Sequence, residues 1–180
     1  GGFGVLDEIN MAKNEALAVM HSVLDFRHII DVPGYGRMEA DSATRFIVTM
    51  NYGYAGTREL NEALASRFVV IQMPPISCEN LQKLLHREFP TLKEKGVQQF
   101  SALFLDLRKK CENAEISSKA LDLRGLLSAV RMMHFGLDVG RALDMGLTNK
   151  VFDSYERGLV RDVISSRVPA HLKRNRLFSD

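Results

Sequence analysis

Two apolar runs in the first third of the chain lead into polar side chains, and this pattern constrains the fold most strongly. Gly4 to Asn10 reads as a short strand followed by the adjacent carboxylates of Asp7 and Glu8. Arg45 to Asn51 reads as a second buried strand, which ends in the amide of Asn51. In open α/β sheets, ligands bind in the crevice beyond the carboxyl ends of the strands. We therefore expect these side chains to meet at one edge of a parallel sheet.

An Asp-Glu pair at the end of a strand suits phosphate chemistry. In nucleotide-hydrolysing folds the first acid holds Mg²⁺, directly or through water, and the second orients and activates the attacking water. Asp7 and Glu8 are candidates for these two roles. The same pattern also arises wherever an apolar strand runs out into solvent, so the pair alone leaves both interpretations open.

A helix and a third strand are predicted after Asn51. Residues 57–67 have a helical pattern with Thr57 as the N-cap, and Leu60 occupies the position that a capping box would give to Glu or Gln. The helix ends in Arg67 and leads into an apolar run, Phe68 to Met73, that reads as a strand. Strands alternating with helices indicate a parallel sheet.

Pro74 and Pro75 divide the chain into two parts. Proline cannot continue a strand ladder, and Ser77 is a good N-cap, so the segment reads as a linker that begins a helix. Beyond it, apolar residues recur at helical spacing and predict about five helices. The clearest positions are Leu81, Leu84, Leu85 and Phe89, then Val97, Phe100, Leu103, Phe104 and Leu107, then Leu123, Leu126, Leu127, Val130 and Met133.

The ordered set of features resembles the AAA+ ATPases, specifically the MoxR and dynein-related group that includes the CbbQ, NorQ and GvpN proteins. Asn-Glu-Ala-Leu-Ala-Ser-Arg-Phe at residues 61–68 makes the set specific, whereas each strand motif alone is loose. Arg27 to Met38 resembles the β-hairpin that this group inserts before the second strand. The resemblance covers nearly all 180 residues. It implies an α/β plus all-α fold, with a truncated parallel-sheet AAA+ nucleotide-binding core at residues 1–75 and a helical lid bundle at 76–180.

The resemblance assigns roles around bound ATP and Mg²⁺. Asp7 and Glu8 look like the Walker B acids, with Mg²⁺ held at Asp7 directly or through water, and Glu8 as the catalytic base. Asn51 looks like sensor 1, which helps to position the water. Arg67 looks like an arginine finger that reaches the γ-phosphate in a neighbouring subunit's site. The alternative for Arg67 is a helix-terminal cation that faces the negative end of the helix dipole.

A lid residue completes the set. Arg124, in Leu121 to Leu127, looks like the sensor 2 arginine at the start of a lid helix, where it reports nucleotide state. Lys119 is its nearest competitor, and a solvated cation without a ligand is the alternative for Arg124.

One motif of the family does not occur in this sequence. No Gly-x-x-x-x-Gly-Lys-Ser/Thr phosphate loop is found, and Gly1 to Gly4 lacks the lysine and precedes a strand rather than a helix. In the family this Walker A loop lies upstream of Walker B. We therefore expect the chain to be the carboxyl-terminal part of a larger ATPase, and we expect it to be inactive by itself.

The family also implies partners. An arginine finger in trans requires self-association into a ring, usually a hexamer. Members are commonly remodelling chaperones that act on protein clients, often with a partner that carries a von Willebrand factor A domain. This step rests on family analogy rather than on residue chemistry.

Composition indicates an ordinary globular protein. Hydrophobic residues make up 46% and charged residues 26%, and no apolar run approaches the roughly 18 residues that span a bilayer. Cys78 and Cys111 are far apart and lack metal-ligand spacing, so we expect reduced thiols and a cytoplasmic location.

The net charge of +2 indicates no strong field, and we do not expect nucleic acid as a partner. One basic cluster lies near the end of the chain. This cluster has two interpretations. It is either a basic surface that faces solvent or a neighbouring subunit, or a surface that binds nucleic acid. Its members are Arg167, His171, Lys173, Arg174 and Arg176.

Two other functions remain open from the sequence. A non-catalytic assembly module would dock on complete ATPase subunits through the lid and the Arg67 surface. A McrB-like nucleic-acid-processing motor would use the same ATPase residues together with the basic cluster.

Overall fold

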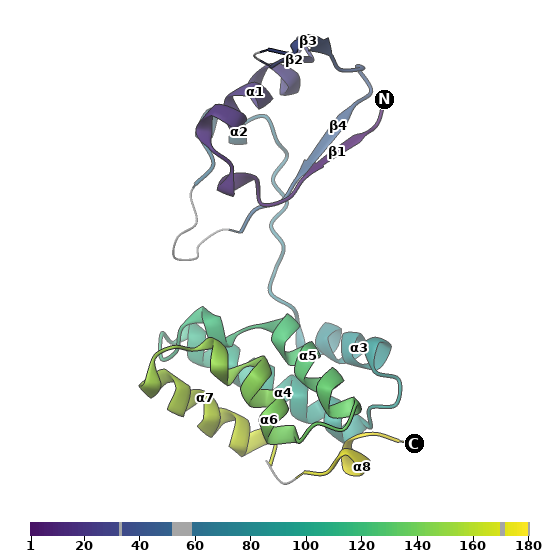
Figure 1. Cartoon of the computed structure of the whole chain (residues 1–180), viewed down its shortest axis with the longest axis vertical. Coiled ribbons are helices and arrows are strands. Elements are labelled where there is room, and N and C mark those ends of the chain that lie inside the picture. Colours follow the sequence, from purple (N-terminus) through teal and green to yellow (C-terminus); the bar gives the residue numbers. More distant parts are fainter. Residues whose placement is uncertain (33, 52–58, 170–171, 180) are drawn as a thin grey trace. The chain divides into compact units, whose positions relative to one another are not determined.

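The computed structural model describes residues 1–32, 34–51, 59–169 and 172–179. The chain divides into two compact units, Gly1–Met73 and Pro74–Asp180, and Figure 1 shows their elements. Within the described residues, the first unit holds the strands and the second is built from helices. This confirms the mixed class predicted from the sequence, a small parallel sheet followed by a helical part. The assignment of the two units as core and lid stays a prediction.

The first unit contains a two-stranded parallel sheet. Strand β1 (Phe3–Leu6) pairs with β4 (Arg45–Val48) in the register Phe3↔Arg45 to Leu6↔Val48. Side chains alternate along both strands, so that one face of the sheet is partly buried and the other is exposed. Since the register has no offset, both strands end at the same level, which is the arrangement predicted for their polar ends.

A helix and a hairpin lie between these strands in the sequence. A 3-10 turn, η1 (Ile9–Met11), leads into α1 (Asn14–Leu24). Strands β2 (Ile29–Val32) and β3 (Gly36–Glu39) pair antiparallel, so a hairpin is present where the resemblance predicts one. Its turn carries Tyr35, which is exposed, between Gly34 and Gly36. Both glycines have positive φ, 86° and 80°, which favours glycine at these positions.

The helix predicted over residues 57–67 is shorter in the structure. Helix α2 spans Glu62–Ala65, and the side chain of Asn61 caps it by accepting a hydrogen bond from the Ala63 amide at 2.8 Å. The predicted cap, Thr57, lies outside the described residues. The prediction was wrong for residues 59–61, because Asn is a strong N-cap and Glu62 then stands favourably in the first turn. It was also wrong for residues 66–67, since the helix ends at Ala65 and a turn follows.

The strand predicted over Phe68 to Met73 is also wrong. These residues form no strand, and Val69 and Ile71 are 93% and 78% exposed. A strand is stable only when a neighbour satisfies its backbone groups. In the described part of the chain, β1 and β4 pair only with each other. Residues 68–73 therefore have no neighbouring strand to pair with, despite their high strand propensity.

The second unit is a helical bundle with one continuous core. Within the described residues, four of its five longer helices have a side-chain N-cap, which accepts a hydrogen bond from a backbone amide of the first turn. These caps are Ser77, Asp122, Asp138 and Asp153. The fifth helix begins after Lys93, whose side chain accepts no such bond. The predicted cap at Ser77 is therefore confirmed. The helices are α3 (Cys78–Glu88), α4 (Glu94–Glu112), α5 (Leu123–His134), α6 (Val139–Gly146), α7 (Ser154–Arg167) and α8 (Arg174–Leu177), with 3-10 turns η2 (Ser118–Ala120) and η3 (Thr148–Lys150).

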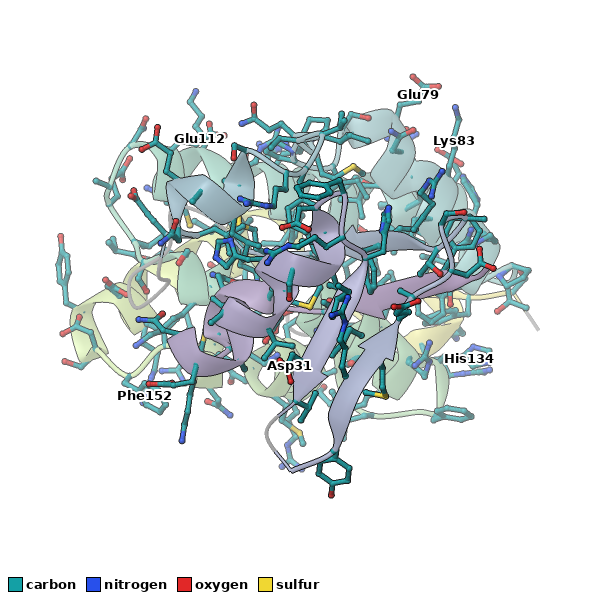
Figure 2. The ribbon with its side chains drawn as sticks, turned by 90° about the horizontal axis from the view of Figure 1, so that it is seen from above. Asp31, Glu79, Lys83, Glu112, His134 and Phe152 are labelled. Atoms are coloured by element: carbon teal, nitrogen blue, oxygen red, sulfur yellow. The ribbon has the colours of Figure 1, made fainter. Side chains whose placement is uncertain are left out.

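The apolar positions predicted from helical spacing line the core. Leu81, Phe100, Leu107 and Leu126 are fully buried, and so is Met133. Charged pairs lie on the outside, as for Glu79 and Lys83 on α3, whose carboxylate and ammonium are 2.6 Å apart (Figure 2). The periodic pattern was therefore a reliable guide to the buried face of each helix.

Helices α5 and α6 approach each other through glycine. A Cβ added to Gly146 would lie 2.5 Å from the carbonyl oxygen of Gly125, and one added to Gly125 would meet the carbonyl oxygen of Gly146. No real Cβ tolerates such a contact with backbone. The glycine inside the helical pattern is thus explained by close packing of two backbones.

Candidate functional site

The candidate site lies at the carboxyl ends of β1 and β4. Pairing continues past the strands, since the Thr49 amide donates to the Leu6 carbonyl at 3.0 Å and the Ile9 amide donates to the Thr49 carbonyl at 3.0 Å. These two bonds fix the segment after β1 against the segment after β4. Asp7 and Glu8 therefore stand beside Asn51, as the sequence predicts for strands that end at one edge.

Hydrogen bonds join the predicted residues directly. The Asn51 side-chain amide donates to Glu8 Oε1 at 3.3 Å, and the buried Asn10 side chain donates to the Asn51 carbonyl at 3.1 Å. The Thr49 hydroxyl donates to Asp7 Oδ1 and accepts a bond from the Glu8 amide at 3.1 Å. The result is one polar network that ties both carboxylates to the end of β4.

Glu8 has an unusual backbone conformation. Its φ of 52° and ψ of 46° lie in the left-handed region, which a residue with a side chain rarely adopts. Residues held in such regions cluster at active sites and switches. The conformation directs the chain out of β1 and into η1 immediately after the acid pair.

The oxygen donors of this edge fit a hard divalent cation. Asp7 and Glu8 are exposed, and each has one carboxylate oxygen without a hydrogen bond in the described part of the chain. No group of three or more metal-ligating side chains occurs among the described residues. Mg²⁺ is commonly held by one or two carboxylates together with water and substrate phosphates, so two acids suit a Mg²⁺-nucleotide better than a closed metal cage.

A polar cavity of about 430 Å³ adjoins the network in the first unit. Asn10 lines it and also bonds Asn51, which links the cavity wall to the candidate site. The remaining polar lining comes from α1 and from the segment before α2, namely Asn14, His21, Glu59 and Asn61.

Arg67 lies just beyond the end of α2. Its side chain is exposed, and its guanidinium donates to the carbonyl of Ala63 in the last turn of the helix. Within the described residues it makes no hydrogen bond or ion pair with Asp7, Glu8 or Asn51. The observed contact matches the helix-terminal interpretation, while an exposed position also leaves the guanidinium able to reach another molecule.

Arg67 also lies near a strongly acidic carboxyl. A side-chain hydrogen bond from Arg27 is the main reason that the pKa of Asp25 falls from 3.8 to about 2, and the charge of Arg67 adds a smaller effect in the same direction. The Arg27 guanidinium and the Asp25 carboxylate are 2.6 Å apart.

Arg124 belongs to the second unit. It stands in the first turn of α5 and is exposed. The preceding cap, Asp122, accepts from the Gly125 amide at 3.0 Å and pairs with Lys150. Burial raises the pKa of Asp122, but the bonds from Lys150 and Gly125 outweigh burial and leave the pKa below its ordinary value.

Lys119, the competitor of Arg124, is differently placed. Its ammonium lies 5.2 Å from the centre of the exposed Phe152 ring, which Figure 2 labels. That contact engages the Lys119 charge within the second unit. Arg124 is the less engaged of the two cations in the described part of the chain.

Two residues of the network were not singled out from the sequence. Thr49 and Asn10 each bridge the ends of β1 and β4 through a side chain. A threonine near a strand end and an asparagine in a turn are common, so neither carries a signal until the strand partner is known.

The basic cluster is partly used within the fold. Arg167 pairs with Asp106 at 2.5 Å, and Arg174 donates to the His134 carbonyl at 2.8 Å. His171 lies outside the described residues. Lys173 and Arg176 are exposed. Because Arg167 and Arg174 bond within the fold, the cluster presents less free positive charge than its sequence indicates.

No helix in the described ranges is long and apolar enough to cross a membrane.

Comparison with known proteins finds a family match within the first unit. Residues 1–68 match the AAA domain of the dynein-related subfamily. The matched part contains Asp7, Glu8, Asn51 and Arg67 and ends before Arg124. The match supports an AAA+ ATPase, a family that uses nucleotide and usually Mg²⁺.

The chain also has bacterial relatives. An uncharacterised protein of Bacillus subtilis strain 168, YojN, is 35% identical over 164 residues, which cover 91% of this chain and 54% of the relative. An uncharacterised protein of Staphylococcus aureus strain NCTC 8325 is 32% identical over 160 residues, which cover 88% of this chain and 60% of the relative. The chain thus spans little more than half the length of these relatives.

Proposed function

We propose that this chain is part of an ATP-hydrolysing AAA+ remodelling motor of the MoxR type. The observation that carries the proposal is the parallel, unshifted pairing of β1 with β4, which joins Asp7, Glu8 and Asn51 in one hydrogen-bonded network. A pair of acids and an amide at the carboxyl edge of parallel strands suits a Mg²⁺-nucleotide, since Mg²⁺ is commonly held by one or two carboxylates and ligands of open α/β sheets bind at this edge.

Each residue has a stated task in this proposal. Asp7 holds Mg²⁺ directly or through water, and the cation neutralises charge that develops on the phosphates. Glu8 accepts a proton from the attacking water, and Asn51 holds Glu8 through its Oε1 and helps to orient that water. By analogy with the family, ATP would be bound by a phosphate loop that lies upstream of the Walker B strand.

Arg67 and Arg124 act beyond this edge in the proposal. Arg67, exposed at the end of α2, reaches the γ-phosphate bound by a neighbouring subunit. Arginine supplied in trans is worth about 10³- to 10⁵-fold in the rate of phosphoryl transfer. Arg124, exposed at the start of α5, reports nucleotide state to the helical unit. A ring, a hexamer by family analogy, is then required for hydrolysis.

The complete protein would couple this cycle to a client. By analogy with the MoxR group, the client is a protein, and a von Willebrand factor A domain is a candidate partner. We also propose a cytoplasmic location, because Cys78 and Cys111 are free thiols.

Mixing two inactive variants tests the proposal. The test uses a full-length protein that contains the phosphate loop. Glu8→Gln keeps the shape of the side chain but cannot act as a base, and Arg67→Ala removes the finger, so each variant alone should bind ATP and not hydrolyse it. A mixed ring contains interfaces that pair an intact Glu8 site with an intact Arg67. We expect partial recovery of ATP hydrolysis in the mixture.

Failure of recovery has a definite meaning. If Arg67 serves the site of its own subunit, every site in the mixture carries one lesion, and activity stays absent. If Arg67→Ala alone hydrolyses ATP at the normal rate, Arg67 is a helix-terminal cation and not a finger, and its hydrogen bond to the Ala63 carbonyl agrees with that role.

A second candidate is an assembly module that does not hydrolyse ATP. The exposed apolar run at Val69–Met73 and the exposed face of the sheet favour it, since large exposed apolar surface marks protein contacts. Normal assembly of an unaltered full-length protein that shows no ATP turnover would support this candidate against the motor.

A further inference from the structure

Thr49 contacts the end of β1 more extensively than any residue predicted for the site. Its amide bonds the Leu6 carbonyl, its carbonyl accepts from the Ile9 amide, and its hydroxyl bonds both residues between them. The two backbone bonds are available to any residue at this position. The two hydroxyl bonds are available only to a side chain that carries a donor and an acceptor on Cβ.

The hydroxyl acts on both acids at once. It donates to Asp7 Oδ1, which fixes the rotation of that carboxylate and leaves Oδ2 as the oxygen without a hydrogen bond in the described chain. It accepts a hydrogen bond from the Glu8 amide at 3.1 Å. This bond stabilises the left-handed backbone conformation of Glu8, which is energetically unfavourable for a residue with a side chain.

Asn51 completes the positioning from the other side. Its amide holds Glu8 Oε1 at 3.3 Å, so Glu8 is held at its backbone by Thr49 and at its carboxylate by Asn51. Removing a partner that orients a metal ligand typically lowers metal affinity by about 10- to 100-fold.

We infer that Thr49 is a positioning residue, which holds Asp7 in the orientation that binds the divalent cation and Glu8 in the conformation that faces the water. This inference rests on the proposed function of the same edge. It predicts that the hydroxyl, and not the shape of the side chain, is what the site requires.

The test compares three variants of the 180-residue chain. Thr49→Val keeps the branched shape and removes the hydroxyl, and Thr49→Ser keeps the hydroxyl. Thr44→Val is the matched control, because Thr44 precedes β4 at the opposite end of the strand and its hydroxyl makes no hydrogen bond in the described chain. The readouts are hydrogen exchange of the Glu8 and Ile9 amides and the broadening of the Asp7 and Glu8 amide signals by MnCl₂.

The expected pattern separates the side chain from the backbone. In Thr49→Val, exchange at the Glu8 amide should accelerate about tenfold, while the Ile9 amide, bonded to the Thr49 carbonyl, should be unchanged. The Mn²⁺ concentration at half-broadening should rise about tenfold in Thr49→Val and stay within about twofold in Thr49→Ser and Thr44→Val.

The contrary results are distinct. Unchanged Mn²⁺ broadening in Thr49→Val, or an equal loss in Thr49→Ser, would overturn the role of Thr49 and leave the proposed ATPase site intact. Absence of broadening at Asp7 and Glu8 in the unaltered chain would overturn the proposed metal site, and the role of Thr49 with it.

Discussion

Replacing Gly125 by alanine should destabilise the helical unit, because two backbones meet at this position. The added Cβ would meet the Gly146 carbonyl oxygen, which belongs to backbone and cannot move aside as a side chain can. The nearby Lys150 Nζ and Asp122 Oδ2, at 2.9 and 3.0 Å, are ends of side chains and can shift. Relief therefore requires α5 and α6 to separate.

Two effects of opposite sign set the magnitude. Overpacking of a well-packed site costs about 1 to 3 kcal/mol and occasionally more, and a contact with backbone belongs at the upper end. The change from glycine to alanine inside a helix returns about 1 kcal/mol. We expect a net loss of about 2 kcal/mol, which at a urea m-value of about 2 kcal/mol/M lowers the unfolding midpoint by about 1 M.

Gly158→Ala is the matched control. Gly158 lies inside α7, is exposed, and an added Cβ would meet nothing within 4 Å. The same chemical change should raise stability by about 0.5 to 1 kcal/mol there. Urea unfolding followed by helical circular dichroism measures both variants. Stability of Gly125→Ala equal to or above the unaltered chain would refute the packing argument.

Two further predictions concern the first unit. The Asp25 carboxyl should titrate near pH 2 by NMR, and Arg27→Gln should return the titration midpoint toward 3.8. Since the pKa of Asp25 is lower in the folded state, the ion pair stabilises the fold above pH 3.8, and this stabilisation is lost as the pH falls through about 2. A midpoint near 3.8 in the unaltered chain would contradict the ion pair. In hydrogen exchange, the backbone amides of β1 and β4 should exchange faster than those of α4 and α5. The reason is that the described sheet has two strands and one exposed face, whereas the helical bundle has a continuous core. Slower exchange in the strands than in the helices would contradict this expectation.

The sequence predicted the carboxyl edge well because strand patterns and polar strand ends are local signals. Asp7, Glu8 and Asn51 lie together because β1 and β4 pair in parallel without offset. The hydroxyl of Thr49 was missed because its meaning depends on which residue lies opposite, and register is a long-range property.

The two wrong predictions, the strand at residues 68–73 and the start of the helix at residue 57, have different causes. Phe68 to Met73 has strong strand propensity, but propensity does not supply a partner strand. The helix at residues 57–67 was placed too early because Asn61 competes as a cap with any earlier residue.

The helical unit was predictable in its core and less so in its packing. Leu81, Phe100 and Leu126 were identified by spacing and are buried. The position of Gly125 inside a helix could be read from the sequence, but its reason lies in Gly146, which is on another helix. The roles of Arg67 and Arg124 stay predictions, since both are exposed and their proposed ligands belong to the nucleotide site.

The proposed function requires that the edge formed by Asp7, Glu8 and Asn51 hydrolyses ATP in the full-length protein. The most direct measurement compares ATP binding with ATP turnover in the full-length protein and in two variants, Glu8→Gln and Glu15→Gln. Glu15 is an exposed acid in the first turn of α1, which controls for loss of one negative charge nearby. We expect Glu8→Gln to bind ATP normally and to lose turnover by at least about 100-fold, as removal of a general base does, while Glu15→Gln retains both. Turnover by Glu8→Gln at the rate of the unaltered protein would show that Glu8 is not the catalytic base and that this edge is not the hydrolytic site.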